Sequence, residues 1–311
     1  MKIKNKKGME FAWIFAIIVG AMILFLAFYF IGHQVLSNKT SQGTEEVHGL
    51  DILFNPFSYL GAMGAVTSKP IELPRASNLE FDCDTNGLGS DAIIVDSGLT
   101  RNIYDKYIFS ENFNAKKIQT ISMPFTMPWR VADLIFVFPS DKEYCFTNMP
   151  AELQNELELL NYSNFYFDIY DCHENATRVC FSPHGEQCDI HVVSPVDYTE
   201  GYVLKNGQKL YFVGRDYSLL LGAIFSRDKD YYDCNVKRLA IRIGMEIQVY
   251  NEKQKALLEK GCSTTFGLDN LKTMAKNIQT SKDVNENDLN DLKTAAENIE
   301  NLNYNSGCSL F

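Results

Sequence analysis

Residues 229–259 read KDYYDCNVKRLAIRIGMEIQVYNEKQKALLE, and this stretch carries apolar side chains at three- and four-residue spacing. The apolar positions are Val236, Leu239, Ala240, Ile243, Ile247, Tyr250 and Leu257. That period is typical of an α-helix with one buried face, so the stretch predicts a single long helix. Because such a helix needs another layer of structure to cover its apolar face, it also predicts a layered domain.

The sequence after this stretch predicts two more helices with one apolar face each. Their apolar positions are Leu268, Leu271, Met274 and Ile278 in the first, and Leu289, Leu292, Ala296, Ile299 and Leu302 in the second. A short helix is expected before the long one, at DYSLLLGAIFS, residues 216–226. Residues 214–311 are therefore expected to form a helical C-terminal layer.

Residues 76–213 are rich in strand-forming segments. The runs with many β-branched and aromatic residues are LEFDC, AIIVD, KIQTISM, ADLIFVF, EYCFTN, NFYFDIYD, RVCFS, DIHVVS and KLYFVG. Asn206-Gly207 marks a hairpin turn, and one helix is expected at residues 149–160 with Pro150 as its first helical residue. The fold class is therefore α+β, with a disulfide-rich mixed β-sheet domain under the helical layer.

The N-terminal segment predicts a membrane anchor. Residues 11–31 are almost wholly apolar, and a helix needs about 20 such residues to cross a bilayer. The lysines before this run are Lys2, Lys4, Lys6 and Lys7. Since positive charge is retained on the cytoplasmic side, residues 1–37 are expected to form a single-pass anchor with a cytoplasmic N-terminus. Residues 38–75 are then a stalk and docking segment, and the later residues lie outside the cytoplasm.

Charge and composition restrict the partners of this domain. The chain has a net charge of −10, and residues 1–10 hold four lysines and one glutamate, so the rest carries −13. Such an acidic domain is expected to avoid nucleic acid. The expected partners are the lipid bilayer through residues 11–31, and other envelope proteins or copies of the chain itself. Three Asn-x-Ser/Thr sequons on the expected outer side, at Asn38, Asn161 and Asn175, permit glycosylation.

All eight cysteines follow the expected anchor, which predicts four disulfides. Cys180 and Cys188 flank a turn and are expected to pair, and Cys145 is expected to pair with Cys172. Cys234 and Cys262 lie at opposite ends of the long helix, about 40 Å apart if it is continuous. A disulfide needs Cα atoms within roughly 7 Å, so that pair is excluded. The remaining pairs are Cys262–Cys308 with Cys83–Cys234 or, alternatively, Cys234–Cys308 with Cys83–Cys262.

Two stretches resemble metal sites in part. In RVCFSPHGEQCDIH, residues 178–191, His184 and His191 stand among cysteines, but a blue-copper site needs a second histidine well upstream, and zinc-type C-x2-C pairs are absent. We favour a disulfide-closed hairpin there. Asp82, Asp84 and Asn86 match the start of a calcium loop, but Ile93 stands where a bidentate Glu belongs. A polar turn is favoured, so no cofactor is expected and calcium is the alternative.

Two segments carry a resemblance to known groups of proteins. KKGMEFAWIFAIIVGAMIL, residues 6–24, resembles the N-terminus of archaeal type IV pilin-like proteins and Tad-type pseudopilins, although Glu10 stands two residues after the Gly rather than five. The resemblance implies an anchor that also serves assembly, and processing after Gly8. RVCFSPHGEQCDI, AIFSRDKDYYDCNVKRL and the terminal CSLF are similar to single-span proteins of small-genome archaea, which implies an archaeal surface location.

No sequence motif for catalysis is present. The sequence lacks G-x-S-x-G, H-E-x-x-H and a phosphate-binding glycine loop, and cysteines held in disulfides are not nucleophiles. We therefore expect a structural or interaction protein of the cell envelope rather than an enzyme. The alternative is an extracytoplasmic binding module or enzyme that uses the Cys/His stretch or the calcium-like turn.

Overall fold

The computed structural model describes residues 19–26, 28, 70–96, 98–168, 170–182, 188–262 and 265–311. Residues 19–26 and 28 are helical, and their large apolar side chains are exposed. Most of the expected span at residues 11–31 lies outside the described residues. Within the part of the chain that is described, no helix combines the length and the apolar character needed to cross a bilayer.

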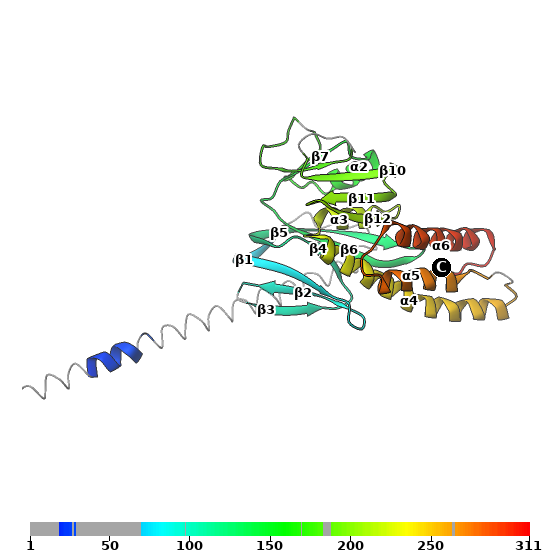
Figure 1. Cartoon of the computed structure of the whole chain (residues 1–311), viewed down its shortest axis with the longest axis horizontal. Helices are drawn as coiled ribbons and strands as arrows, with labels where there is room; N and C mark the ends of the chain where they lie inside the picture. Colours follow the sequence, from blue (N-terminus) through cyan, green and yellow to red (C-terminus); the bar gives the residue numbers. More distant parts are fainter. Residues whose placement is uncertain are drawn as a thin grey trace, which may run out of the picture.

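The domain contains two six-stranded sheets (Figure 1). Sheet 1 has the order β3 (Leu99–Ile103), β2 (Ser90–Val95), β1 (Ile71–Asp84), β5 (Phe113–Thr126), β6 (Arg130–Pro139), β4 (Tyr107–Ser110). Sheet 2 has the order β12 (Gln208–Val213), β11 (Glu200–Lys205), β10 (Ile190–Val196), β9 (Thr177–Cys180), β7 (Tyr144–Thr147), β8 (Phe165–Tyr166). Both sheets are mixed, since β4 runs parallel to β6 and β9 runs parallel to β7 and β10.

Five helices between residues 151 and 305 complete the α+β fold. They are α2 (Ala151–Leu159), α3 (Ser218–Phe225), α4 (Lys229–Glu259), α5 (Leu268–Thr280) and α6 (Glu286–Asn305). Helices α4, α5 and α6 lie together on one side of the sheets and form the expected C-terminal layer (Figure 1). All eight residues of α3 are buried, because this apolar helix packs against strands of both sheets.

Five expectations about the strands and helices are corrected. The structure has two sheets rather than one, and β1 begins at Ile71, inside the segment expected as a stalk. The sequence did not predict β3 or β4, and the run NFYFDIYD contributes only the two residues of β8. Pro150 is the N-cap of α2, so the helix starts one residue later, at Ala151. Proline favours the start of a helix because its nitrogen has no hydrogen to donate. This holds both for the N-cap and for the first helical residue.

Sheet 1 curls so that its two ends approach each other. A core cluster contains residues from all six strands, including Phe81, Ile93 and Ile135, together with Tyr231 of α4. The backbone N–H of Ile108 on β4 donates to the Asp91 carboxylate on β2 at 2.9 Å, although these strands are not neighbours in the sheet. Side chains in the N-terminal half of α4 contact this region, where β4 approaches β2.

The structure has four disulfides, and they follow the first of the two pairings left open by the sequence. They are Cys83–Cys234, Cys145–Cys172, Cys180–Cys188 and Cys262–Cys308, with Cα–Cα distances of 6.1, 5.7, 6.0 and 6.2 Å. Helix α4 is continuous from Lys229 to Glu259, which keeps Cys234 away from Cys262. The first bridge ties sheet 1 to α4, and the last ties the end of α4 to the end of α6.

Candidate functional site

The Cys/His stretch is a disulfide-closed segment in sheet 2. Cys180 ends β9 and is bonded to Cys188, so neither sulfur is available as a thiolate ligand. His191 lies half-buried on β10, and His184 lies outside the described residues. His173 is exposed, with Nδ1 2.7 Å from the Glu143 carboxylate. The Cys180–Cys188 disulfide therefore stabilises this part of sheet 2.

The calcium-like sequence forms the turn between β1 and β2. Asp82 and Asp84 are exposed on the same face of β1, and Asn86 donates from its backbone and its side chain to Asp84 Oδ1, at 3.0 and 2.7 Å. Gly87 and Gly89 have φ of +64° and +72°, which a turn needs and which glycine adopts without strain. Over the described ranges, no group of three or more His, Cys, Asp or Glu side chains is arranged to hold a metal ion.

The remaining predicted sites are either exposed on the surface or lie outside the described residues. Asn161 and Asn175 are both exposed, the first just after α2 and the second in the turn before β9. Asn38 and the expected processing position Gly8 lie outside the described residues. Glycosylation at the two exposed positions stays a prediction.

A buried ion pair that the sequence did not predict links sheet 1 to α4. Arg238 on α4 and Asp91 on β2 lie 2.6 Å apart, and their side chains are 1% and 0% exposed. The guanidinium also donates to Asn235 Oδ1 and to the backbone carbonyl of Lys106, each at 2.8 Å. Asn235 in turn donates to the Ile108 carbonyl at 3.0 Å. These bonds satisfy the polar groups that the incomplete closure of sheet 1 would otherwise leave unpaired.

The surroundings of Arg238 exclude water from this pair. The guanidinium lies over the ring of Tyr107, 4.8 Å from its centroid. On another side, a Cβ on Gly89 would lie 2.7 Å from Arg238 Cγ, so only glycine fits there. Burial raises the pKa of Asp91 even though Arg238 and the N–H of Ile108 favour the ionised form. Asp91, Arg238 and Asn235 are all buried. We therefore interpret the ion pair as a structural contact that holds α4 on sheet 1.

A second charged cluster lies in a polar cleft of about 570 Å³, which is lined by strands of sheet 2 and by connections that include the one between β4 and β5. Glu111 forms ion pairs with Lys142 and Lys205. The Lys205 ammonium, on a side chain that is 8% exposed, also donates to the backbone carbonyls of Ile224 at 3.1 Å and Ser226 at 2.8 Å. Three acceptors thus satisfy the three N–H groups of Lys205, and the cluster joins the end of α3 to β11 and to the connection between β4 and β5.

The Glu111 cluster predicts a specific loss of stability in acid. Burial raises the pKa of Glu111, but Lys205 and Lys142 outweigh burial and hold this pKa below its usual value. The stabilisation is therefore complete above the unfolded-state pKa of about 4.3 and is lost as the pH falls through the lower folded-state value. We expect E111Q to melt at a lower temperature than the wild type at pH 7, with a difference that shrinks below about pH 4. Thermal unfolding at several pH values measures this. E259Q, on the exposed end of α4, is the control, and a difference that stays constant into acid would contradict the assignment.

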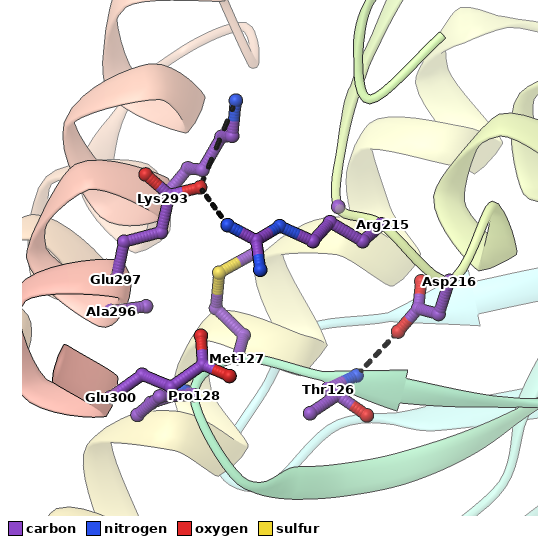
Figure 2. A pocket seen from close by; sticks show the side chains of 10 residues that line it. Thr126, Met127, Pro128, Arg215, Asp216, Lys293, Ala296, Glu297 and Glu300 are labelled. Carbon is purple, nitrogen blue, oxygen red and sulfur yellow. Dashed lines mark hydrogen bonds and ion pairs between the residues drawn. The ribbon is translucent and has the colours of Figure 1, made fainter. Parts of the chain in front are cut away.

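A smaller cleft of about 150 Å³ lies between the β5–β6 turn, the segment before α3, and α6 (Figure 2). Figure 2 shows the Arg215 guanidinium directed toward Glu297, and these groups lie 3.7 Å apart. Lys293 is 4.0 Å from Glu297 and donates to Glu200 at 2.8 Å. Asp216 accepts the backbone N–H of Thr126 at 2.7 Å, as well as bonds from the backbone and hydroxyl of Ser218. Burial raises the pKa of Asp216. Ion pairs and hydrogen bonds therefore join the walls of this cleft to one another.

A buried tryptophan lies at this end of the domain. Trp129 is 4% exposed, and its Nε1 donates to Glu246 on α4 at 2.6 Å. Its ring packs on Tyr250 with centroids 4.0 Å apart and meets Phe311 edge-on at 5.8 Å. The segment after Cys308 therefore covers the tryptophan, and this aromatic cluster is a packing feature.

Comparison of the chain with protein-family models, with curated proteins and with solved structures found no match.

Proposed function

We propose that this chain is a single-pass membrane protein whose disulfide-braced domain lies outside the cytoplasm and serves as a structural or interaction component of the cell envelope. The pairing of all eight cysteines carries this proposal. Such bridges form and persist in oxidising compartments and are rare in the cytosol. The lysines before the apolar run support the orientation, because positive charge is retained inside.

The internal charges support a role in interaction rather than catalysis. The three charged clusters around Asp91, Glu111 and Glu297 are each occupied by ion pairs between elements of the fold. The resemblance of residues 6–24 to pilin-like N-termini adds the proposal that the anchor helix takes part in an assembly in an archaeal envelope, with processing after Gly8.

A reporter fusion tests the topology. Alkaline phosphatase joined after Phe311 through a flexible linker is expected to be active, because it folds only outside the cytoplasm. Green fluorescent protein at the same position is expected to be dark when exported unfolded. A fluorescent fusion with inactive phosphatase would place the domain inside and would overturn the proposal.

A further inference from the structure

The polar cleft around Glu111 has the dimensions of a site for a small ligand. Its volume of about 570 Å³ lies in the range of about 300–1,000 Å³ that is typical of such sites. Ile190 is the one apolar side chain among the described residues that line it. The other lining side chains are polar or charged, so the cleft suits a polar ligand rather than an apolar one.

The charges that line the cleft are not balanced. Three cations and two carboxylates give a net charge of +1, and these groups belong to Lys142, Lys205, Arg227, Glu111 and Asp189. The whole chain carries −10, so the cleft is locally positive on an acidic protein. An anionic group is therefore attracted to this cleft, although the surface as a whole repels anions.

Two of the cations have hydrogen-bond donors that the fold does not use. Arg227 has five N–H groups, of which Nε donates to Asp228 at 2.7 Å and Nη1 donates to the Phe81 carbonyl at 2.9 Å. Its other N–H groups have no acceptor among the described residues. The Lys142 ammonium has three N–H groups; one donates to Glu111, and a tyrosine ring centroid lies 5.2 Å away. At least one N–H group of Lys142 is thus left without a partner in the described part of the chain.

Lys142 and Arg227 flank the ion pair of Glu111 with Lys205. Lys142 bonds to Glu111 from one side. Arg227 directly follows Ser226, whose carbonyl accepts from Lys205 at 2.8 Å. The side chains of Lys142 and Arg227 are 29% and 33% exposed, so a ligand in the cleft can reach their free N–H groups.

Uncharged polar side chains complete the lining, and they are Asn112, Thr177 and Asn206. Asn112 Oδ1 accepts the backbone N–H of Phe81 at 3.0 Å, which leaves the amide N–H groups of Asn112 for a ligand. Amide and hydroxyl groups of this kind pair with the hydroxyl groups of a sugar, because both partners can donate and accept. The cleft therefore offers cations for one acidic group and neutral polar groups for several hydroxyls.

We propose that this cleft binds an acidic sugar, whose carboxylate or phosphate group is held by the free N–H groups of Lys142 and Arg227. Hydrogen bonds between such cations and an oxyanion are shorter and stronger than those between neutral groups. The hydroxyl groups of the sugar contact the uncharged side chains of the lining. This inference rests on the proposed interaction role for its setting and gives that role a ligand class, while the binding itself does not depend on the topology of the chain.

Isothermal titration calorimetry of the full chain in lipid nanodiscs tests the proposal with four small molecules. Glucuronate or glucose 6-phosphate, or both, are expected to bind with a dissociation constant below about 1 mM, and the tighter of the two identifies the acidic group. Neutral glucose and propionate, which has a carboxylate but no hydroxyl groups, are expected to bind at least about tenfold more weakly. No binding of either acidic sugar up to about 10 mM would overturn the proposal. Propionate that binds as tightly as the acidic sugars would overturn the assignment to a sugar.

Three variants locate the bound sugar. K142Q is expected to weaken binding at least about fivefold, because it removes a charged donor. D189N removes a carboxylate from the cleft but keeps an acceptor for the backbone N–H of Arg178, so it is expected to strengthen binding. K282Q removes a positive charge from an exposed position of the helical layer and is the matched control.

Circular dichroism checks that each variant is folded, and D189N keeps the test decisive if K142Q lowers stability. Binding that is unchanged by K142Q or by D189N would place the sugar elsewhere and overturn the proposal. Calorimetry and the topology reporter are independent measurements, so failure of one leaves the other interpretable.

Discussion

Asp91→Ala is expected to lower the free energy of unfolding by about 3–5 kcal/mol, because it leaves the Arg238 guanidinium buried without a counter-charge. The guanidinium is 1% exposed and lies under Gly89 and Tyr107, so water cannot replace the lost carboxylate. The variant also removes the acceptor of the Ile108 N–H, where the ends of sheet 1 meet. Denaturant unfolding of the full chain in detergent, followed by circular dichroism, measures the loss.

Two further variants show whether the buried charge is the cause. D91A/R238M removes both charges and is expected to recover part of the stability, since a buried ion pair replaced by apolar groups is often near neutral. E252A breaks the exposed ion pair with Lys255 and is expected to leave unfolding nearly unchanged. If D91A proved as mild as E252A, Asp91 and Arg238 would not hold α4 on sheet 1.

Replacing Cys83 and Cys234 by alanine is expected to destabilise the chain by about 5 kcal/mol, the second large effect. This bridge spans 151 residues and fixes α4 to β1, so it restricts the unfolded chain more than any shorter loop does. The double variant C180A/C188A is the matched control. Its bridge spans 8 residues, for which the same chain-entropy relation gives about 2.6 kcal/mol.

Guanidinium unfolding of both double variants compares the two bridges. The larger loss of stability is expected for C83A/C234A. In hydrogen exchange, the amides of α4 are expected to be the first to lose their protection in this variant. Equal losses would show that chain entropy does not set the contribution of these bridges, and that local packing around each cystine does.

The sequence alone predicted the helical layer well, because helix signals are local. The apolar period at residues 229–259 coincides with α4, and its continuity is what excluded Cys234–Cys262. The same reasoning left two ways to pair the last four cysteines. The structure selects Cys83–Cys234 and Cys262–Cys308, since α5 packs against both α4 and α6 and brings the chain back to the end of α4.

Most strands lie on the runs that the sequence predicted, but their arrangement in two sheets and the charged clusters could not be predicted in this way. Strand β3 reads LTRNI and is mostly polar, while β4 is only four residues long, so neither shows the alternation of a half-buried strand. Asp91 and Arg238 are separated by 147 positions, and nothing local marks either one as buried. Arg238 stands directly before Leu239 in a helix, where a charged residue is normally solvated.

Non-reducing peptide mapping of the chain isolated from its native cells, with free thiols alkylated before lysis, tests the account most directly. The account predicts four linked pairs, Cys83–Cys234, Cys145–Cys172, Cys180–Cys188 and Cys262–Cys308, with no alkylated cysteine. Alkylated thiols at Cys172, Cys180 and Cys188 would contradict it. They would place the domain in a reducing compartment and return the Cys/His stretch to consideration as a metal site.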